Sequence, residues 1–265
     1  MSLFDFDANF LHRDLRDDFD HHLSVAQSNG VGRFIVPGST LVDSAECLAL
    51  SKRYEGKIFA ACGIHPFRVQ EIELNDVNTL ELDRLVADDA CLAVGECGLD
   101  YSEGFPSCEI QVPWFRHHVE LSHRHSLPLF LHVRDAHHDF LAIMDEFTSL
   151  PNVCVHCFTG SEEELREYCR RGYYISISGH VIRKQINLKE WLAIIPPDRL
   201  LIETDAPYLG WRGCRSTEEK KKTQNYPNVP AALLQLASHI SQEAGLPLET
   251  LAERTTANAM RFICR

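Results

Sequence analysis

Eight short apolar runs rich in β-branched residues recur along the chain, and most of the segments between them have helical periodicity. The runs cover residues 3–9, 33–38, 58–63, 91–96, 128–132, 153–156, 173–178 and 200–204. An open doubly wound sheet would usually have fewer strands and a glycine-rich phosphate fingerprint, and no G-x-G-x-x-G or Walker pattern is present. The alternation therefore predicts an α/β protein with a TIM-like (β/α)8 barrel.

Helices are predicted between and after these runs. They cover residues 14–29, 41–55, 76–89, 109–126, 137–149, 161–172, 187–195, 229–244 and 248–263. Ser161 and Glu164 have the spacing of a capping box, in which each side chain satisfies a backbone N–H at a helix start. Gly30 and Gly172 fall where two of the helices should end, because glycine readily adopts the conformation of a helix C-terminus.

The length and composition fit one globular enzyme. The chain has 265 residues, of which 45% are hydrophobic, so we expect a single domain over residues 1–265. It opens with MSLFDFDANF, which is no signal sequence, and no run approaches the roughly 18 apolar residues of a membrane span. The ten cysteines are scattered, which favours reduced thiols. We expect a monomer that binds no membrane and lies in the cytoplasm or, in a eukaryote, the nucleus.

The net charge of -12 limits how the protein can hold a polyanion. Tight binding along a nucleic acid relies on clustered Lys and Arg that displace counterions. An enzyme that grips one strand end through bound cations needs little surface charge, so a nucleic-acid substrate remains open. The one dense basic run, Lys220 to Lys222, is either a solvated loop or a patch that contacts the substrate backbone. It lies in the long irregular segment 210–228, a candidate substrate loop or lid.

Four metal-type side chains stand at the ends of predicted strands: Glu96, His132, His156 and Asp205. In a (β/α)8 barrel these ends converge on one face, where active sites of that fold lie. Two-metal hydrolysis needs carboxylates and imidazoles around ions about 4 Å apart. Each side chain alone could instead cap a helix or bond a backbone carbonyl, but four such coincidences are improbable.

Six longer motifs contain these residues, and through them the chain resembles the TatD family of metal-dependent deoxyribonucleases. The motifs are GIHPF (63–67), GECGLDY (95–101), HVRDAHHDF (132–140), HCFTGSEEE (156–164), ETDAPYL (203–209) and NAMRFI (258–263). The resemblance implies a TIM-like barrel, divalent metals and hydrolysis of DNA phosphodiesters, typically from the 3′ end. It also implies that Glu96, His132, His156 and Asp205 occupy ligand positions.

The chain departs from many relatives at the end of the first strand. Where they carry an H-x-H pair, this sequence has Asp7 and Asn9. A carboxylate at position 7 can hold Mg²⁺ or Mn²⁺, which prefer oxygen ligands, whereas Asn9 offers at best a weak carbonyl. We expect up to two ions, Mg²⁺ or Mn²⁺ ahead of Zn²⁺. Alternatively, Asp7 only bonds a neighbouring ligand or helix.

Chemistry suggests a role for each ligand. Glu96 is the candidate bridge between both ions, since one carboxylate can offer an oxygen to each. His132 and His156 would bind the second ion. Asp205 would bind the first ion and accept the proton of the attacking water. Asp205 and Glu96 are thus the predicted catalytic residues.

Further residues are candidates for substrate contact. His65 either contacts a phosphate or packs. Arg134 either binds a phosphate or forms a structural ion pair with Asp135 or Asp100. Asp100, four residues after Glu96, is itself a candidate for substrate contact.

Two aromatic residues follow the last predicted strand. Tyr208 and Trp211 could stack on a terminal base, or pack under a loop. Cys97 and Cys157 flank ligand positions and are interpreted as small packing residues. His137 either lines the pocket or forms part of a solvated helix start, and we favour the helix start.

Three functions compete at this level. The leading hypothesis is a metal-dependent nuclease acting from a DNA 3′ end and also on RNA. The second is a metal-dependent hydrolase of a small amide, ester or lactone, because related barrels use the same ligand types. The third is a non-catalytic barrel that has lost its first metal site, which the departure at Asp7 and Asn9 motivates.

Overall fold

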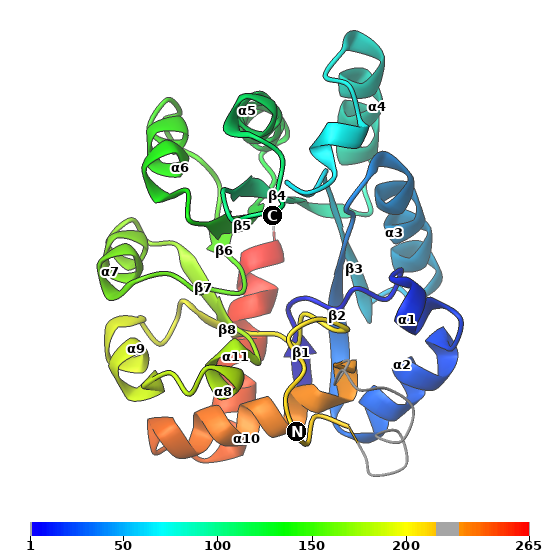
Figure 1. The fold of residues 1–265 in the computed structure, drawn as a ribbon. Helices are drawn as coiled ribbons and strands as arrows, with labels where there is room; N and C mark the ends of the chain where they lie inside the picture. The colour runs from blue at the N-terminus through cyan, green and yellow to red at the C-terminus, as the bar shows by residue number, and fades with distance from the viewer. Residues whose placement is uncertain (1, 216–227, 265) are drawn as a thin grey trace.

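The computed structural model describes residues 2–215 and 228–264, and these contain one sheet with all eight predicted strands (Figure 1). The strands pair in parallel in sequence order. They are β1 (Leu3–Asp5), β2 (Val31–Pro37), β3 (Ile58–Cys62), β4 (Cys91–Asp100), β5 (Leu129–Arg134), β6 (Val153–Val155), β7 (Tyr174–Ile177) and β8 (Leu200–Ile202). The prediction of a TIM-like (β/α)8 barrel is confirmed.

The first and last strands close the barrel. Ala8 and Ala206 form a parallel bridge just beyond the ends of β1 and β8. The backbone N–H of Phe6 donates to the carbonyl of Ile202 at 3.1 Å. Because the closure lies where β1 and β8 end, it holds the segments after these strands, with Asp7 and Asp205, side by side.

Helices surround the sheet (Figure 1). They are α1 (Arg13–Arg16), α2 (Phe19–Ser28), α3 (Leu41–Arg53), α4 (Asp76–Val86), α5 (Cys108–His125), α6 (His137–Met144), α7 (Glu162–Arg170), α8 (His180–Arg183), α9 (Leu188–Ile194), α10 (Leu233–Ala244) and α11 (Leu248–Ile263), with 3-10 turns η1 (Val69–Glu71) and η3 (Pro230–Ala232). Within the described ranges, no helix is long and apolar enough to cross a membrane.

The structure differs from the predicted helices in two respects. The segment 14–29 divides into α1 and α2 at Asp17 and Asp18, residues whose side chains favour turns and caps over a helix interior. The single turns α8 and η1 were missed because four or fewer residues cannot show helical periodicity. The start of the segment 210–228 is described as far as Arg215, but Lys220 to Lys222 lie outside the described residues.

The predicted helix ends are confirmed. Ser161 accepts a hydrogen bond from the backbone N–H of Glu164, whose carboxylate accepts from that of Ser161, so the capping box is complete. Gly30 and Gly172 follow the C-caps of α2 and α7 with φ of 81° and 76°. These left-handed conformations cost glycine little and end both helices.

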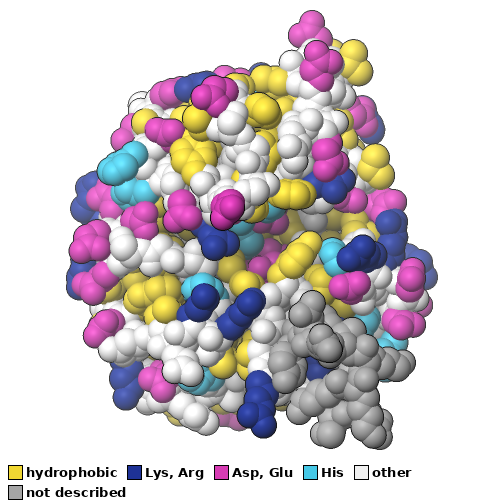
Figure 2. All heavy atoms as spheres, viewed as in Figure 1, with side chains coloured by type: hydrophobic (Ala, Val, Ile, Leu, Met, Phe, Trp, Pro, Cys, Tyr) yellow, Lys and Arg dark blue, Asp and Glu magenta, His cyan; other side chains and the backbone are white. Residues whose placement is uncertain are grey.

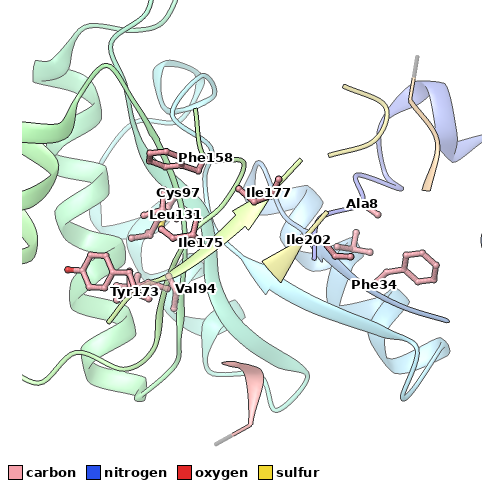
Figure 3. Close-up of a cluster of buried hydrophobic side chains, with 14 of the residues drawn as sticks. Ala8, Phe34, Val94, Cys97, Leu131, Phe158, Tyr173, Ile175, Ile177 and Ile202 are labelled. Atoms are coloured by element: carbon pink, nitrogen blue, oxygen red, sulfur yellow. The ribbon is translucent and has the colours of Figure 1, made fainter. Parts of the chain in front are cut away.

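Two apolar layers hold the barrel together. In the outer layer, strand residues such as Leu131 and Ile175 pack between the sheet and the helices (Figure 3). Cys97 lies in this layer, and its burial raises the pKa of its thiol. The inner layer fills the barrel and is covered at one end by Phe262 and Ile263 of α11. All ten cysteines lie within the described residues, and none of them forms a disulfide.

Candidate metal centre

The predicted ligands come from four strand ends and meet on one face of the barrel. Glu96 and His132 lie on β4 and β5, and His156 and Asp205 lie just beyond β6 and β8. Figure 2 shows histidine and acidic side chains inside a hollow at the centre of this face. The structure thus brings together the residues that the sequence placed at a common rim.

One oxygen of Glu96 is the focus of the centre. Its Oε1 lies 3.2 Å from Nε2 of His65, 3.2 Å from Nδ1 of His132 and 2.8 Å from Nε2 of His156. The Glu96 side chain is only 8% exposed. A carboxylate shared by several imidazoles in this way can serve two ions at once.

Two groups of side chains in the described part of the chain could each hold an ion, and both include Glu96. One group adds His65 and His132, and the other adds Asp7 and His156. This division differs from the expectation that His132 and His156 share an ion. The two rings are 5.7 Å apart on neighbouring strands, so each can serve a different group.

Asp7 is part of the centre. It is fully buried, and its Oδ2 lies 3.1 Å from Nδ1 of His156. The amide of Asn9 donates to Oδ1 of Asp7 and to Oδ1 of Asp205, both at 3.2 Å. Asn9 therefore acts as a donor between two carboxylates, not as the weak carbonyl ligand considered from the sequence. In the sequence, the only sign of this role was that Asn9 follows Asp7 by two residues, a spacing too common to predict a hydrogen bond.

Two buried carboxylates stand behind the histidines. Oδ2 of Asp100 lies 2.8 Å from Nε2 of His132, and Oε1 of Glu203 lies 3.3 Å from Nδ1 of His156. The contact of Asp100 with His132 is a hydrogen bond, which fixes the tautomer of His132 and leaves its other nitrogen free to bind a metal, whereas Glu203 and His156 lie close together without a hydrogen bond. Asp100 was considered for substrate contact, but its fully buried position favours orienting His132.

His65 is oriented by the loop after β3. Its Nδ1 accepts a hydrogen bond from the backbone N–H of Phe67 at 3.1 Å. Burial lowers the pKa of His65, which favours the neutral ring. In the neutral tautomer that accepts at Nδ1, the proton is on Nε2, the atom that faces Glu96. His65 therefore presents a hydrogen-bond donor to the centre.

The protonation of Glu96 and His156 follows from their contact. Burial opposes the ionisation of Glu96, but the charge of His156 and the contact with His132 outweigh it and hold the pKa of Glu96 well below its ordinary value. Burial likewise lowers the pKa of His156, but Glu96 and Glu203 raise it, with a net value well above normal. Without a cation, the protein balances its carboxylates with protons on imidazole.

Asp7 and Asp205 behave in the opposite way. Burial raises the pKa of Asp7 well above its ordinary value, and the charge of Asp205 adds to the effect. Burial also raises the pKa of Asp205 to about 7, with Glu96 and Glu203 contributing. Both carboxylates therefore tend to hold protons near neutral pH unless a positive charge stands beside them.

The donor atoms fit a divalent metal ion. Asp7 Oδ2, both ring nitrogens of His156 and both carboxylate oxygens of Glu203 are buried, and they make no hydrogen bond within the described residues. Buried polar atoms without partners are costly and rare. Carboxylate oxygens with imidazole nitrogens are the ligands that Mg²⁺, Mn²⁺ and Zn²⁺ use, so a cation at these atoms would satisfy them.

The remaining candidates lie around the centre. Arg134 is exposed at the end of β5 and forms no ion pair with Asp135 or Asp100, so that structural tie is not seen. It lines a cavity of about 180 Å³ with His180 and Tyr168. None of the residues of the centre lines this cavity, but Arg134 follows His132 by two residues on β5.

The two aromatic candidates differ in their exposure to solvent. Tyr208 is 51% exposed, and its ring centroid lies 5.2 Å from that of His12. Trp211 is buried against Gly179, as the packing alternative predicts. His137 is half-buried and contacts the hydroxyl of Tyr168 at 3.0 Å, so it is not the solvated helix start that was predicted.

Comparison with known proteins places this geometry in a family. Residues 4–263 match the model of the TatD related DNase family. The 3'-5' ssDNA/RNA exonuclease TatD of Cronobacter sakazakii is 35% identical over 266 residues, covering 99% of this chain and 98% of that protein. The crystal structure of a TatD homologue from Escherichia coli K12 has a TM-score of 0.87 and 26% identity, covering 98% of this chain and 97% of the other.

A second solved structure agrees in fold and length. A TatD family hydrolase from Entamoeba histolytica has a TM-score of 0.83 and 26% identity, covering 99% of this chain and 98% of the other. The likeness therefore extends over the whole barrel and not only over the motifs. The chain belongs to the TatD-related DNase family.

Proposed function

We propose that this protein is a metal-dependent nuclease that removes nucleotides from the 3′ end of single-stranded DNA and RNA. The observation that carries the proposal is the meeting of His65, His132 and His156 on Oε1 of Glu96, which gives two candidate ion groups with a shared ligand. The family and the exonuclease named TatD, at 35% identity, supply the substrate class.

Asp205 is the proposed general base. Bound divalent ions supply Lewis acidity, lower the pKa of a ligand water and neutralise the phosphate. A pKa of about 7 suits Asp205 to accept a proton from water near neutral pH. The amide of Asn9 holds one Asp205 oxygen, which directs the other towards the centre.

The phosphate contacts come from the surrounding rim. We assign the exposed guanidinium of Arg134 to phosphate oxygens, and His65 Nε2–H as a second donor where His65 faces the substrate instead of Glu96 or an ion. Tyr208 is exposed beside Asp205 and offers an aromatic face to a nucleotide. Asp100 orients His132 through a hydrogen bond, and the carboxylate of Glu203 lies beside His156.

The centre favours hard cations. Asp7 and Glu96 contribute carboxylate oxygens to the candidate groups. Asp205, which lies outside both groups, is joined to Asp7 through Asn9. Carboxylates suit Mg²⁺ or Mn²⁺, while the imidazoles also accept Zn²⁺. We propose up to two ions. For the whole protein we propose a monomeric, single-domain enzyme of the cytoplasm, and the absence of disulfides among the ten described cysteines supports a reducing compartment.

An assay with oligonucleotides labelled at the 5′ end tests the proposal. We expect a ladder of products shortened from the 3′ end, loss of activity on chelation and recovery with Mn²⁺ or Mg²⁺. Glu96→Gln should be inactive, whereas Glu249→Gln, an exposed change on α11 at the other end of the barrel, should match the wild type. Inertness towards oligonucleotides with turnover of an amide, ester or lactone would select the rival hydrolase. Wild-type activity in Glu96→Gln would contradict the proposal.

A further inference from the structure

An array of aromatic rings leads from the candidate metal centre to the surface. The rings of His65 and His132 are 4.9 Å apart. Phe105, in the loop between β4 and α5, lies 6.2 Å from each of them and is nearly parallel to His132, with an interplanar angle of 23°. Phe67 meets Phe105 edge to face at 5.3 Å. We call Phe67 and Phe105 the aromatic shelf.

The shelf is more open than packing alone requires. Phe67 is 42% exposed, and Phe105 is half-buried. Among the large hydrophobic side chains that are exposed in the described residues, the aromatic ones are Phe67 and Tyr208. Each follows a residue of the centre by two or three positions, His65 in one case and Asp205 in the other. A ring that served only to anchor its loop would gain most from burial.

The charge of the centre makes an apolar contact valuable. Asp7, Glu96, Asp100, Glu203 and Asp205 are all carboxylates close to the site, and the whole chain carries -12. Electrostatic attraction along a nucleic-acid backbone is therefore weak away from bound cations and the few basic side chains. Stacking of a base on an aromatic ring is insensitive to this charge, because every base presents a π-face.

We propose that the aromatic shelf binds the base of the 3′-terminal nucleotide while its phosphate occupies the centre at Glu96. This inference rests on the proposed function and adds a substrate determinant to it. A base in a duplex is already stacked and paired, so it must leave the duplex before it can lie on Phe67 and Phe105. The shelf thus selects an unpaired 3′ end and tolerates all four bases.

The test compares two single-stranded oligonucleotides that differ only in the last residue, which carries either a base or a tetrahydrofuran abasic analogue. The wild type should lose about ten-fold in kcat/KM on the abasic end, mainly through KM. Phe67→Ala should lose a similar factor on the normal end and little on the abasic end. Phe67→Trp keeps a stacking face and should retain the preference, whereas Phe67→Leu, which keeps only apolar volume, should not.

Leu80→Ala provides the control. Leu80 is 68% exposed on α4, outside the barrel, and its truncation should leave both rates unchanged. An equal loss on normal and abasic ends in Phe67→Ala would overturn the shelf, as would a wild type that treats the two ends alike. A large drop in thermal stability of Phe67→Ala would assign the ring to packing and would also overturn it. Failure of the proposed function is distinct, because the wild type would then cleave neither oligonucleotide.

Discussion

The inside of the barrel has two layers that are built on the same strands: the inner apolar layer, called here the apolar layer, and the candidate metal centre, called here the charged layer. Phe130 and His132 on β5, and Cys154 and His156 at β6, are spaced by two residues, so each pair faces the same side of its strand. Phe130 and Cys154 belong to the inner apolar layer, whereas the two histidines belong to the candidate metal centre. The layers touch, because the rings of Phe130 and His156 are 4.8 Å apart.

Burial has opposite effects on the stability of the fold in the two layers. In the apolar layer, burial removes hydrocarbon from water and stabilises the fold. In the charged layer, burial raises the pKa of Asp7 and Asp205, which means that their ionised forms oppose folding near neutral pH. One set of strands therefore supplies stability at one end and chemistry at the other. Changes in the two layers should have different consequences for stability and for activity.

The largest effect on activity is expected for Asp205→Asn. Loss of the proposed base should lower kcat by about 10³-fold, measured with an oligonucleotide in saturating Mn²⁺. The metal-free variant should be as stable as the wild type at pH 8 or more stable, because the ionised carboxylate is unfavourable there. Asp198→Asn, an exposed change before β8, is the matched control. Clear destabilisation by Asp205→Asn would erase the distinction between the layers.

Phe262→Ala should give the reverse pattern. Phe262 is fully buried in the apolar layer, with its ring 5.1 Å from that of Phe6 and 5.4 Å from that of Tyr174. Truncation should cost about 3–5 kcal/mol in the free energy of unfolding, measured by denaturant titration. Below the unfolding transition, kcat should stay within about two-fold of the wild type. A loss of kcat in the folded variant would show that the apolar layer also sets the geometry of the centre.

The strands of the apolar layer and the candidate ligands at their ends could be predicted from the sequence, but the contacts that hold the candidate ligands in place could not. Apolar runs reveal strands, and strand ends reveal Glu96, His132 and His156, because both signals are local along the chain. The bond from Asn9 to Asp205 joins residues 196 positions apart, and Phe105 approaches His132 from an irregular loop. Such contacts depend on barrel closure and on loop conformation, for which a single sequence holds no periodic signal.

Asp100→Asn tests the support of the charged layer. The amide keeps the shape but can present an N–H to His132, so it no longer fixes the tautomer that leaves Nδ1 free. Mn²⁺ affinity, measured by calorimetry, should fall about 10- to 100-fold. Asp139→Asn, on a residue that accepts from Tyr101 outside the centre, is the control. Unchanged affinity in Asp100→Asn would assign Asp100 to folding alone.

The pH dependence of metal binding should separate the layers without mutation. Since the pKa of Asp205 is raised to about 7, a proton occupies Asp205 below pH 7 and must leave when a cation binds, and the raised pKa of Asp7 makes its carboxylate a second site of proton release. Mn²⁺ affinity should therefore fall about ten-fold between pH 7 and pH 6 for each proton displaced. Calorimetry in two buffers of different ionisation enthalpy would count the protons. Constant affinity from pH 8 to pH 6, with no proton released, would contradict the raised pKa values.

The smallest effect is expected for Asn9→Ala, which removes the donor between Asp7 and Asp205. Each of the two 3.2 Å bonds holds a carboxylate that burial already discourages from ionising, so their loss should raise both pKa values further. At about 1 kcal/mol for a hydrogen bond, Mn²⁺ affinity at pH 7 should fall about five-fold, and less at pH 8. Asn9→Asp places a third carboxylate between Asp7 and Asp205. In the metal-free state this variant should therefore have a lower thermal stability at pH 8 than Asn9→Ala. If Asn9→Ala instead bound Mn²⁺ more tightly, the amide would be competing with the ion for these oxygens, and its role would be to hold the centre together before metal arrives.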